Sequence, residues 1–154
     1  MIGTDPSRCY GISKSFDAYY SSSWFGHEKK GWLADDYSAR AAVCYQAPPL
    51  DGIWATAPYF HNGSVPTVYH VLNSQARPAC YTRSFRTDLD SYDPVKLGWK
   101  TELCAREQAA DLPPLARRKI YDTALPGRRN TGHTFGDELT EDERWAVIEY
   151  LKTL

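Results

Sequence analysis

The scarcity of aliphatic side chains constrains this sequence more than any other feature. Only 28 of its 154 residues are Leu, Ile, Val or Phe. A fraction below about 20% signals disorder when it is combined with high net charge, but the net charge here is −1. Eleven Tyr and five Trp residues supply further core material. We therefore expect a folded chain with a thin aliphatic core that depends on a cofactor, disulfides or another chain.

Several classes of protein are excluded at this stage. The sequence contains no apolar run of about 18 residues, so we predict no membrane span. The first ten residues show no basic segment followed by an apolar one, so no signal peptide is predicted in this chain. No basic stripe is present either, which argues against a nucleic-acid partner. The length fits a single domain over residues 1–154.

The four cysteines, Cys9, Cys44, Cys80 and Cys104, are widely spaced. Neither C-x-x-C nor the covalent haem attachment signal C-x-x-C-H occurs, which excludes a zinc knuckle and a thioredoxin-type motif. The cysteines are interpreted as structural, either as thiols or as disulfides. Their even number is compatible with an oxidising compartment.

Three segments have the sequence signals of helices. Residues 35–46 combine acidic capping residues with alanines and end before two prolines. Asn62-Gly63 predicts a tight turn, and Ser64 is the expected cap of a helix that carries Pro66 in its first turn. Residues 140–154 begin with a capping box, Thr140 with Glu143, and continue with an apolar stripe.

The remaining segments indicate less regular structure. Near-alternation over residues 81–87 predicts a short hairpin, which Asp93-Pro94 would break. Residues 102–119 look exposed. Residues 120–139 are punctuated by glycines and predict an ordered loop.

Two of the four histidines, His61 and His133, lie on glycine-bounded loops just ahead of predicted helices. Loops held on a scaffold are where ligand-binding groups concentrate, and neutral imidazole is a common ligand of metals and haem. A histidine held by backbone hydrogen bonds in an ordered loop is the alternative. His27 is interpreted as a solvated group, and His70 as a half-exposed surface group within a helix.

Other catalytic patterns are absent or weak. The sequence has no H-E-x-x-H, G-x-S-x-G, Walker A or dinucleotide-binding motif. The paired arginines at 117–118 and 128–129 are interpreted as solvated, although paired arginines can also clamp carboxylates such as haem propionates.

The stretch GIWATAPYFHNGSVPTVYHVL, residues 52–72, resembles the C-terminal haem domain of bacterial dihaem cytochrome c peroxidases. It is most similar to the branch that includes the rubber oxygenases. Weaker landmarks are YQAPPL at residues 45–50, Arg77-Pro78, and LPG, NTGHTFG and LTEDERWAVIEYLKTL within residues 121–154.

The resemblance implies specific roles. Thr56 and Pro58 match positions whose main-chain carbonyls bind a calcium ion between the haems, and such oxygens suit calcium. His133 matches the histidine near the C-terminus that is the distal ligand of the second haem iron. His61 matches a histidine expected near the haem interface, without an assigned role.

The chain departs from this family because it lacks both C-x-x-C-H motifs. Any haem c would be attached outside it, on an N-terminal haem-bearing half of the same or a neighbouring polypeptide. We therefore expect the C-terminal portion of a periplasmic or secreted dihaem c-type cytochrome, a peroxidase or rubber-oxygenase-like oxidoreductase, that is inactive alone. The alternative is a truncated, non-catalytic interaction module that binds no haem. The expected fold is mainly α, with cytochrome c-like helices, long ordered loops and room for one small β-hairpin.

Overall fold

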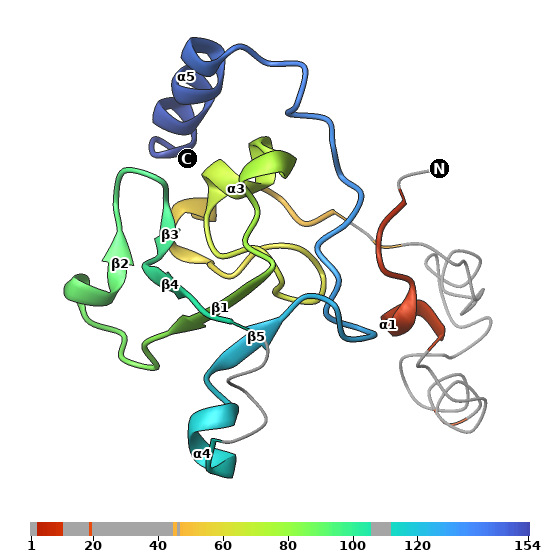
Figure 1. Ribbon diagram of the computed structural model, residues 1–154. Helices are drawn as coiled ribbons and strands as arrows, with labels where there is room; N and C mark the ends of the chain where they lie inside the picture. Colours follow the sequence, from red (N-terminus) through yellow and green to blue (C-terminus); the bar gives the residue numbers. More distant parts are fainter. Residues whose placement is uncertain (1–2, 11–18, 20–44, 46, 106–111) are drawn as a thin grey trace. The chain divides into compact units, whose positions relative to one another are not determined.

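The computed structural model describes residues 3–10, 19, 45, 47–105 and 112–154 (Figure 1). Of the helix predicted at residues 35–46, all residues but Tyr45 lie outside the described residues, and Tyr45 is not helical. The chain divides into two compact units, one formed by Met1–Asp5 with Ala47–Leu154 and the other by Pro6–Gln46. In the second unit, the described residues include the short helix α1, Ser7–Tyr10. All elements below belong to the first unit.

A three-stranded antiparallel sheet has the order β4-β1-β5, with β1 at Cys80–Arg83, β4 at Thr101–Leu103 and β5 at Ile120–Asp122. Its central residue is Tyr81, which pairs with Leu103 on one side and Tyr121 on the other. Tyr81 is 1% exposed, and its ring stacks on Tyr121 with centroids 5.3 Å apart. Aromatic cross-strand pairs of this kind stabilise sheets.

A disulfide joins Cys80 in β1 to Cys104, directly after β4. The backbone N–H of Cys104 also donates to the carbonyl of Cys80 over 3.2 Å. The structural interpretation of these two cysteines is therefore confirmed.

The prediction of a hairpin at residues 81–87 is wrong, because the hairpin lies elsewhere in the chain. Residues 81–83 belong to β1, whose partners are distant in sequence. A small hairpin lies further along, between β2 (Tyr92–Asp93) and β3 (Gly98–Trp99). Asp93 helps to form its turn, because its carboxylate accepts hydrogen bonds from the N–H groups of Val95 and Lys96.

The helix predicted after the Asn62-Gly63 turn is present as α3, Val68–Leu72, but Thr67 caps it instead of Ser64. The hydroxyl oxygen of Thr67 accepts from the N–H of His70. Residues 65–67 stay extended because Val65 forms an isolated β-bridge with Tyr59, and Thr67 forms one with Gly98. A side chain at Gly98 would lie 2.2 Å from the carbonyl oxygen of Pro66, so only glycine permits this approach.

The C-terminal helix α5, Glu141–Leu151, is confirmed together with its capping box. Its buried face contains Ile148 and Leu151, as predicted, and also Arg144, which is 6% exposed. The guanidinium of Arg144 donates to the carbonyl oxygens of Leu72, Gly136 and Leu139 and pairs with Glu141. This arginine therefore connects α5 to the end of α3 and to the preceding loop.

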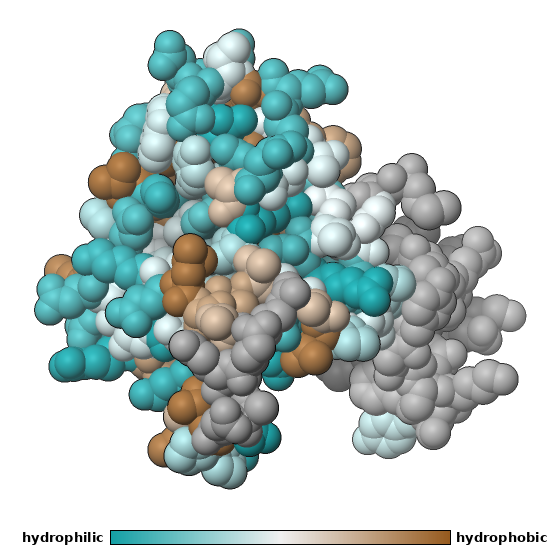
Figure 2. Space-filling view, in the orientation of Figure 1, coloured by the Kyte–Doolittle hydropathy of each residue, from teal (hydrophilic) through white to brown (hydrophobic). Residues whose placement is uncertain are grey.

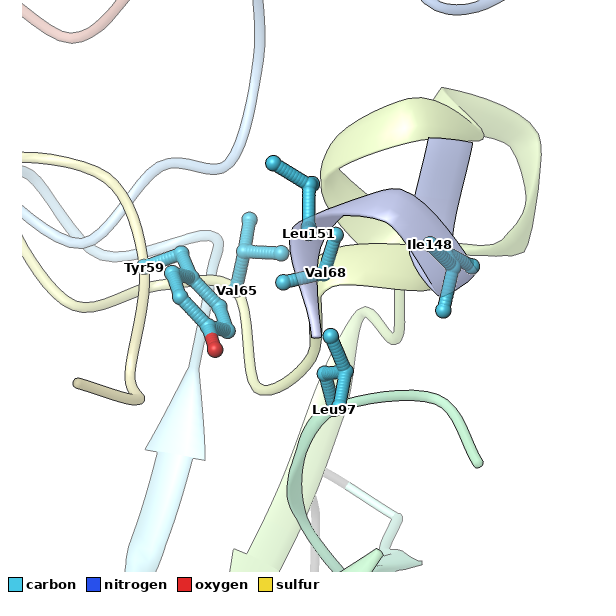
Figure 3. Close-up of a cluster of buried hydrophobic side chains, with 6 residues drawn as sticks. All are labelled: Tyr59, Val65, Val68, Leu97, Ile148 and Leu151. Carbon is cyan, nitrogen blue, oxygen red and sulfur yellow. The ribbon is translucent and has the colours of Figure 1, made fainter. Parts of the chain in front are cut away.

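The hydrophobic core lies where α3, α5 and the loops beside them meet (Figure 3). Six buried side chains form it: Tyr59, Val65, Val68, Leu97, Ile148 and Leu151. Tyr69 of α3 stacks on Trp145 of α5, with ring centroids 5.1 Å apart. The small size of this cluster agrees with the thin aliphatic composition.

The prediction of a mainly α fold is wrong. Within the described ranges, α5 spans eleven residues, whereas α1, α3 and α4 (Pro114–Arg117) span four or five each. Three single-turn 3-10 helices and two small antiparallel sheets account for the other elements, the 3-10 helices being η2 (Ile53–Ala55), η3 (Ser74–Ala76) and η4 (Leu89–Ser91). Segments without clear local sequence signals form strands here, because they pair with segments that are distant in the sequence.

The visible described surface is largely hydrophilic, with apolar side chains in small separate groups (Figure 2). Among the described residues, no helix combines the length and the apolar character needed to cross a bilayer.

Candidate functional site

A tight loop between Tyr59 and Val65 carries His61. Two hydrogen bonds close the loop: the N–H of Tyr59 donates to the carbonyl of Val65 over 2.7 Å, and the reverse bond measures 3.3 Å. Gly63 has φ 70°, as the predicted turn requires, and Phe60 also has a positive φ of 66°. The Asn62 side-chain oxygen accepts from the N–H of Ser64. We call residues 60–64 the His61 loop.

The sheet supports this loop through its tyrosines. The Tyr121 hydroxyl donates to the carbonyl of Asn62 over 2.9 Å. The Tyr81 hydroxyl approaches the carbonyls of Gly63 and Ser64 at 3.4 Å each. The sheet therefore holds the backbone of the His61 loop in place.

A second loop, residues 127–136, carries His133, and we call it the His133 loop. The carboxylate of Asp5, which is 2% exposed, accepts from the N–H groups of Gly127 and Arg129. The Asn130 amide donates to the carbonyl of Pro78 over 3.0 Å. Gly132 and His133 both have positive φ, 74° and 51°. A positive φ is unusual for a residue other than glycine, so this backbone conformation must be held by its surroundings.

The two loops are bonded to each other. The Asn62 amide donates to the carbonyl of Arg129 over 2.8 Å. The rings of Phe60 and His133 have centroids 4.5 Å apart and are tilted by 39°. The rings of His61 and His133 have centroids 6.3 Å apart. The two histidines singled out from the sequence therefore lie together, on two loops that are bonded to each other.

Arg77 is the third member of this site. It follows η3, donates to the carbonyl oxygen of His133 over 2.9 Å, and places its guanidinium carbon 4.8 Å from the centroid of the Phe60 ring. The sequence identified Arg77 only as a weak landmark of the resemblance. Its role depends on carbonyls more than 50 residues away, which local sequence cannot reveal.

The Nε2 atom of His133 is covered and has no hydrogen-bond partner within the part of the chain that the structure describes. Other atoms share this property, the hydroxyl oxygens of Thr4 and Ser64 among them; a hydroxyl is a poor haem ligand, whereas imidazole is a good one. Covered polar atoms without partners are rare and often mark the place of a bound ligand or water.

The electrostatic setting of His133 favours neutral imidazole. Burial lowers the pKa of His133 most, and the neighbouring His61 and Arg77 lower this pKa further. Neutral imidazole is the form that binds a metal. The Nε2 atom and the neutral ring of His133 therefore fit the requirements of an axial haem ligand.

Of the two predicted calcium ligands, Pro58 lies beside the His61 loop, because a side chain at Gly63 would lie 3.1 Å from its Cγ atom. Thr56 follows η2, and Pro58 follows a cis peptide bond from Ala57. Calcium takes six to eight oxygen ligands. Among the described residues no group of three or more His, Cys, Asp or Glu side chains comes together that could complete such a set. Calcium binding at Thr56 and Pro58 stays a prediction.

The prediction of His70 as a half-exposed residue within a helix is confirmed, since it lies in α3. Its ring nitrogen Nδ1 lies 2.7 Å from the hydroxyl of Thr67, and the residue is partly buried. Burial, together with the charges of Lys96 and Arg77, lowers the pKa of His70 to about 4. Its role is local to α3.

Gly136, the glycine that follows His133, serves packing. A side chain there would lie 2.5 Å from the carbonyl oxygen of Leu72. Of the paired arginines, Arg128 lies over the Tyr121 ring and Arg117 donates to the carbonyl of Leu112. A propionate clamp at either pair stays a prediction.

Comparison with known proteins supports a cytochrome c-like assignment. Residues 44–82 match a family described as RoxA-like, cytochrome c-like. The matched segment contains His61, Thr56, Pro58 and Arg77, whereas His133 lies outside it. The cytochrome c-like part of the resemblance is therefore supported, and the dihaem peroxidase part stays a prediction.

Two relatives come from the bacterium Sinorhizobium fredii. The uncharacterized protein y4iJ is 41% identical over 125 residues, which cover 75% of this chain and 18% of that protein. The uncharacterized protein y4iM is 40% identical over 89 residues, which cover 58% of this chain and 19% of that protein. The chain thus spans less than a fifth of the length of these relatives.

Proposed function

We propose that this chain is a portion of a c-type cytochrome oxidoreductase in which His133 is the distal axial ligand of a haem c attached outside the chain. The observation that carries the proposal is the covered Nε2 atom of His133, which has no hydrogen-bond partner among the described residues. Its lowered pKa keeps the ring in the form that binds metal. The cytochrome c-like match over residues 44–82 supports haem as the group concerned.

In this proposal each loop has a distinct task. The His133 loop presents the ligating nitrogen, and Phe60 packs against the ring at 4.5 Å. His61 would lie close to a haem held by His133, because its ring is 6.3 Å from that of His133. When bound, the haem would supply one-electron redox chemistry, with a potential that depends on its axial ligands.

The partner is an N-terminal haem-bearing half of the same or a neighbouring polypeptide. The absence of C-x-x-C-H from this sequence and the small share of its relatives that it covers both support this partner. The Cys80–Cys104 disulfide supports a periplasmic or secreted location, because disulfides persist in oxidising compartments. The substrate, a peroxide or dioxygen, is proposed from the resemblance alone.

Optical spectroscopy with a defined probe tests the ligand assignment. The probe is a ferric haem c peptide that has one histidine ligand and water in the opposite position. Titration of the peptide with the chain should convert its visible spectrum to the low-spin, bis-histidine form. His133→Ala should weaken this conversion at least tenfold, while the matched variant His70→Ala should leave it within twofold of the unsubstituted chain. Equal conversion by the His133→Ala variant would overturn the proposal and favour the non-catalytic interaction module.

A further inference from the structure

We propose that Arg77 is a positioning residue that holds the His133 loop in the conformation that presents the ring of His133. The inference rests on the proposed function for its consequence at haem. Its structural part, that Arg77 fixes the backbone of His133, can be tested without haem.

The guanidinium of Arg77 is saturated by main-chain oxygens. A guanidinium has five N–H donors in a rigid planar arrangement. The three nitrogens make five hydrogen bonds of 2.7–3.2 Å. The acceptors are the carbonyls of His70, Val71, Asn130, Gly132 and His133.

These acceptors belong to two segments that the chain separates by more than 50 residues. Two of them lie on α3, and three lie on the His133 loop. Arg77 therefore attaches the loop to α3, a helix that packs on α5. No lysine could do the same, because an ammonium has three donors and lacks the planar geometry.

The strongest need for this attachment is at His133 itself. Its φ of 51° lies in the left-handed region, which is unfavourable for a residue with a side chain. The carbonyls of Gly132 and His133 both accept from Arg77, at 2.7 and 2.9 Å. Without these bonds the loop can relax to an extended backbone, which would turn the ring of His133 away from its present direction.

Arg77 also contacts the aromatic ring that packs on the ring of His133. Its guanidinium carbon lies 4.8 Å from the centroid of Phe60, and the Phe60 ring lies 4.5 Å from that of His133. The same side chain therefore holds the backbone of His133 and the aromatic ring that packs on it.

Arg144 provides a matched control. It is also a buried arginine that donates to carbonyls of two segments, those of Leu72, Gly136 and Leu139. Its acceptor Gly136 is the last residue of the His133 loop, but Arg144 makes no bond to residues 130–133 among the contacts of the described residues. A loss of stability alone would be common to both arginines, whereas a change at His133 would be specific to Arg77.

The experiment compares Arg77→Lys and Arg144→Lys in the full chain by NMR and by the haem-peptide titration. In Arg77→Lys, the backbone shifts of His133 should move from left-handed to extended values, and the affinity for the haem c peptide should fall at least tenfold. In Arg144→Lys, both should stay at the values of the unsubstituted chain, with the affinity within twofold. Unchanged His133 shifts in Arg77→Lys would overturn the inference.

A third measurement needs no substitution and so does not depend on folding of the variants. In the unsubstituted chain, the Arg77 guanidinium protons should exchange slowly and its rotation should be restricted, in contrast to Arg86, whose side chain is 82% exposed. Fast rotation of Arg77 would overturn the inference. If His133→Ala leaves peptide binding unchanged, the proposed function fails, while the NMR result still decides whether Arg77 fixes the backbone of His133.

Discussion

The aromatic ring of Phe60 packs against the imidazole ring of His133, with centroids 4.5 Å apart, although the two residues lie on separate loops. The same ring lies under the guanidinium of Arg77. Phe60 is therefore the side chain through which the His61 loop supports the ring of His133.

Phe60→Ala should loosen this contact. We expect a loss of about 1–3 kcal/mol in the free energy of unfolding, less than for a fully buried Phe because Phe60 is partly exposed. The ring protons of His133 should also move in the NMR spectrum as the shielding from Phe60 disappears. Phe85 is a matched control, since it also lies beside an arginine but is 52% exposed. Phe85→Ala should cost less than about 0.5 kcal/mol. Similar losses for both variants would contradict this role for Phe60.

The bond between the two loops can be removed without changing the shape of the side chain. Asn62→Asp keeps the oxygen that accepts from Ser64 but loses the amide that donates to the carbonyl of Arg129. We expect a loss of about 1–3 kcal/mol, because a carboxylate would then face a carbonyl. Hydrogen exchange should quicken at residues 129–133. In the control Asn73→Asp, which loses an amide bond to Tyr69, exchange at 129–133 should stay unchanged. Slow exchange at 129–133 in Asn62→Asp would show that this bond does not hold the loops together.

The sequence predicted the elements whose signals are local. The capping box of Thr140 with Glu143 and the stripe of Ile148 and Leu151 predicted α5, because the capping contacts that start this helix lie within its first turn. The turn before α3 was also predicted, since glycine at position 63 permits the φ of 70°.

Elements that depend on distant partners were not predicted. Residues 81–87 alternate like a hairpin, but residues 81–83 belong to β1, whose partner strands lie about 20 and 40 residues away. The cap of α3 moved from Ser64 to Thr67 because Thr67 bridges Gly98. The prediction of a mainly α fold was wrong for the same reason. It relied on the resemblance to a helical family, and strand pairing between distant segments could not be detected in the sequence.

The candidate site was predicted in part. His61 and His133 were both singled out by their glycine-bounded loops, and the structure brings their rings within 6.3 Å. The side chains that hold them, Arg77 and Asp5, bond to main-chain atoms more than 50 residues away. Every residue has main-chain N–H or carbonyl groups, so the residue types in a sequence do not reveal which of these groups a side chain will bind.

The disulfide should contribute most of its stability through the unfolded chain. Cys80 and Cys104 are separated by 24 residues, and closing a loop of this length gives about 3 kcal/mol in the chain-entropy model. Cys104→Ser should lower the free energy of unfolding by that amount in denaturant titrations. Adding a reductant to the unsubstituted chain should give the same loss and should not lower the stability of Cys104→Ser by a similar amount again. A reductant without effect on the unsubstituted chain would contradict this account.

His70 should make the stability depend on pH. Its pKa of about 4 in the folded chain lies below the ordinary value of 6.5, because burial and the charges of Lys96 and Arg77 disfavour the protonated ring, while Asp93 favours it. Between these two values the unfolded chain binds more protons than the folded chain. Stability is therefore greatest above pH 6.5 and falls as the pH drops towards 4.

Chemical unfolding at pH 7 and pH 5 measures this effect. The loss on acidification should be on the order of 1–2 kcal/mol greater for the unsubstituted chain than for His70→Gln, allowing for the partial exposure of the ring. The same loss in both proteins would show that His70 is not the group responsible.

The most direct test of the account asks whether nitrogen from this chain is bonded to haem iron. The chain, labelled with ¹⁵N-histidine, is mixed with the unlabelled ferric haem c peptide, and pulsed electron paramagnetic resonance detects ¹⁵N coupled to the low-spin iron. The account predicts a strong ¹⁵N coupling that persists in His70→Ala and disappears in His133→Ala. A coupling that survives in His133→Ala, or the absence of any ¹⁵N coupling in the unsubstituted chain, would contradict the assignment of His133 as the axial ligand.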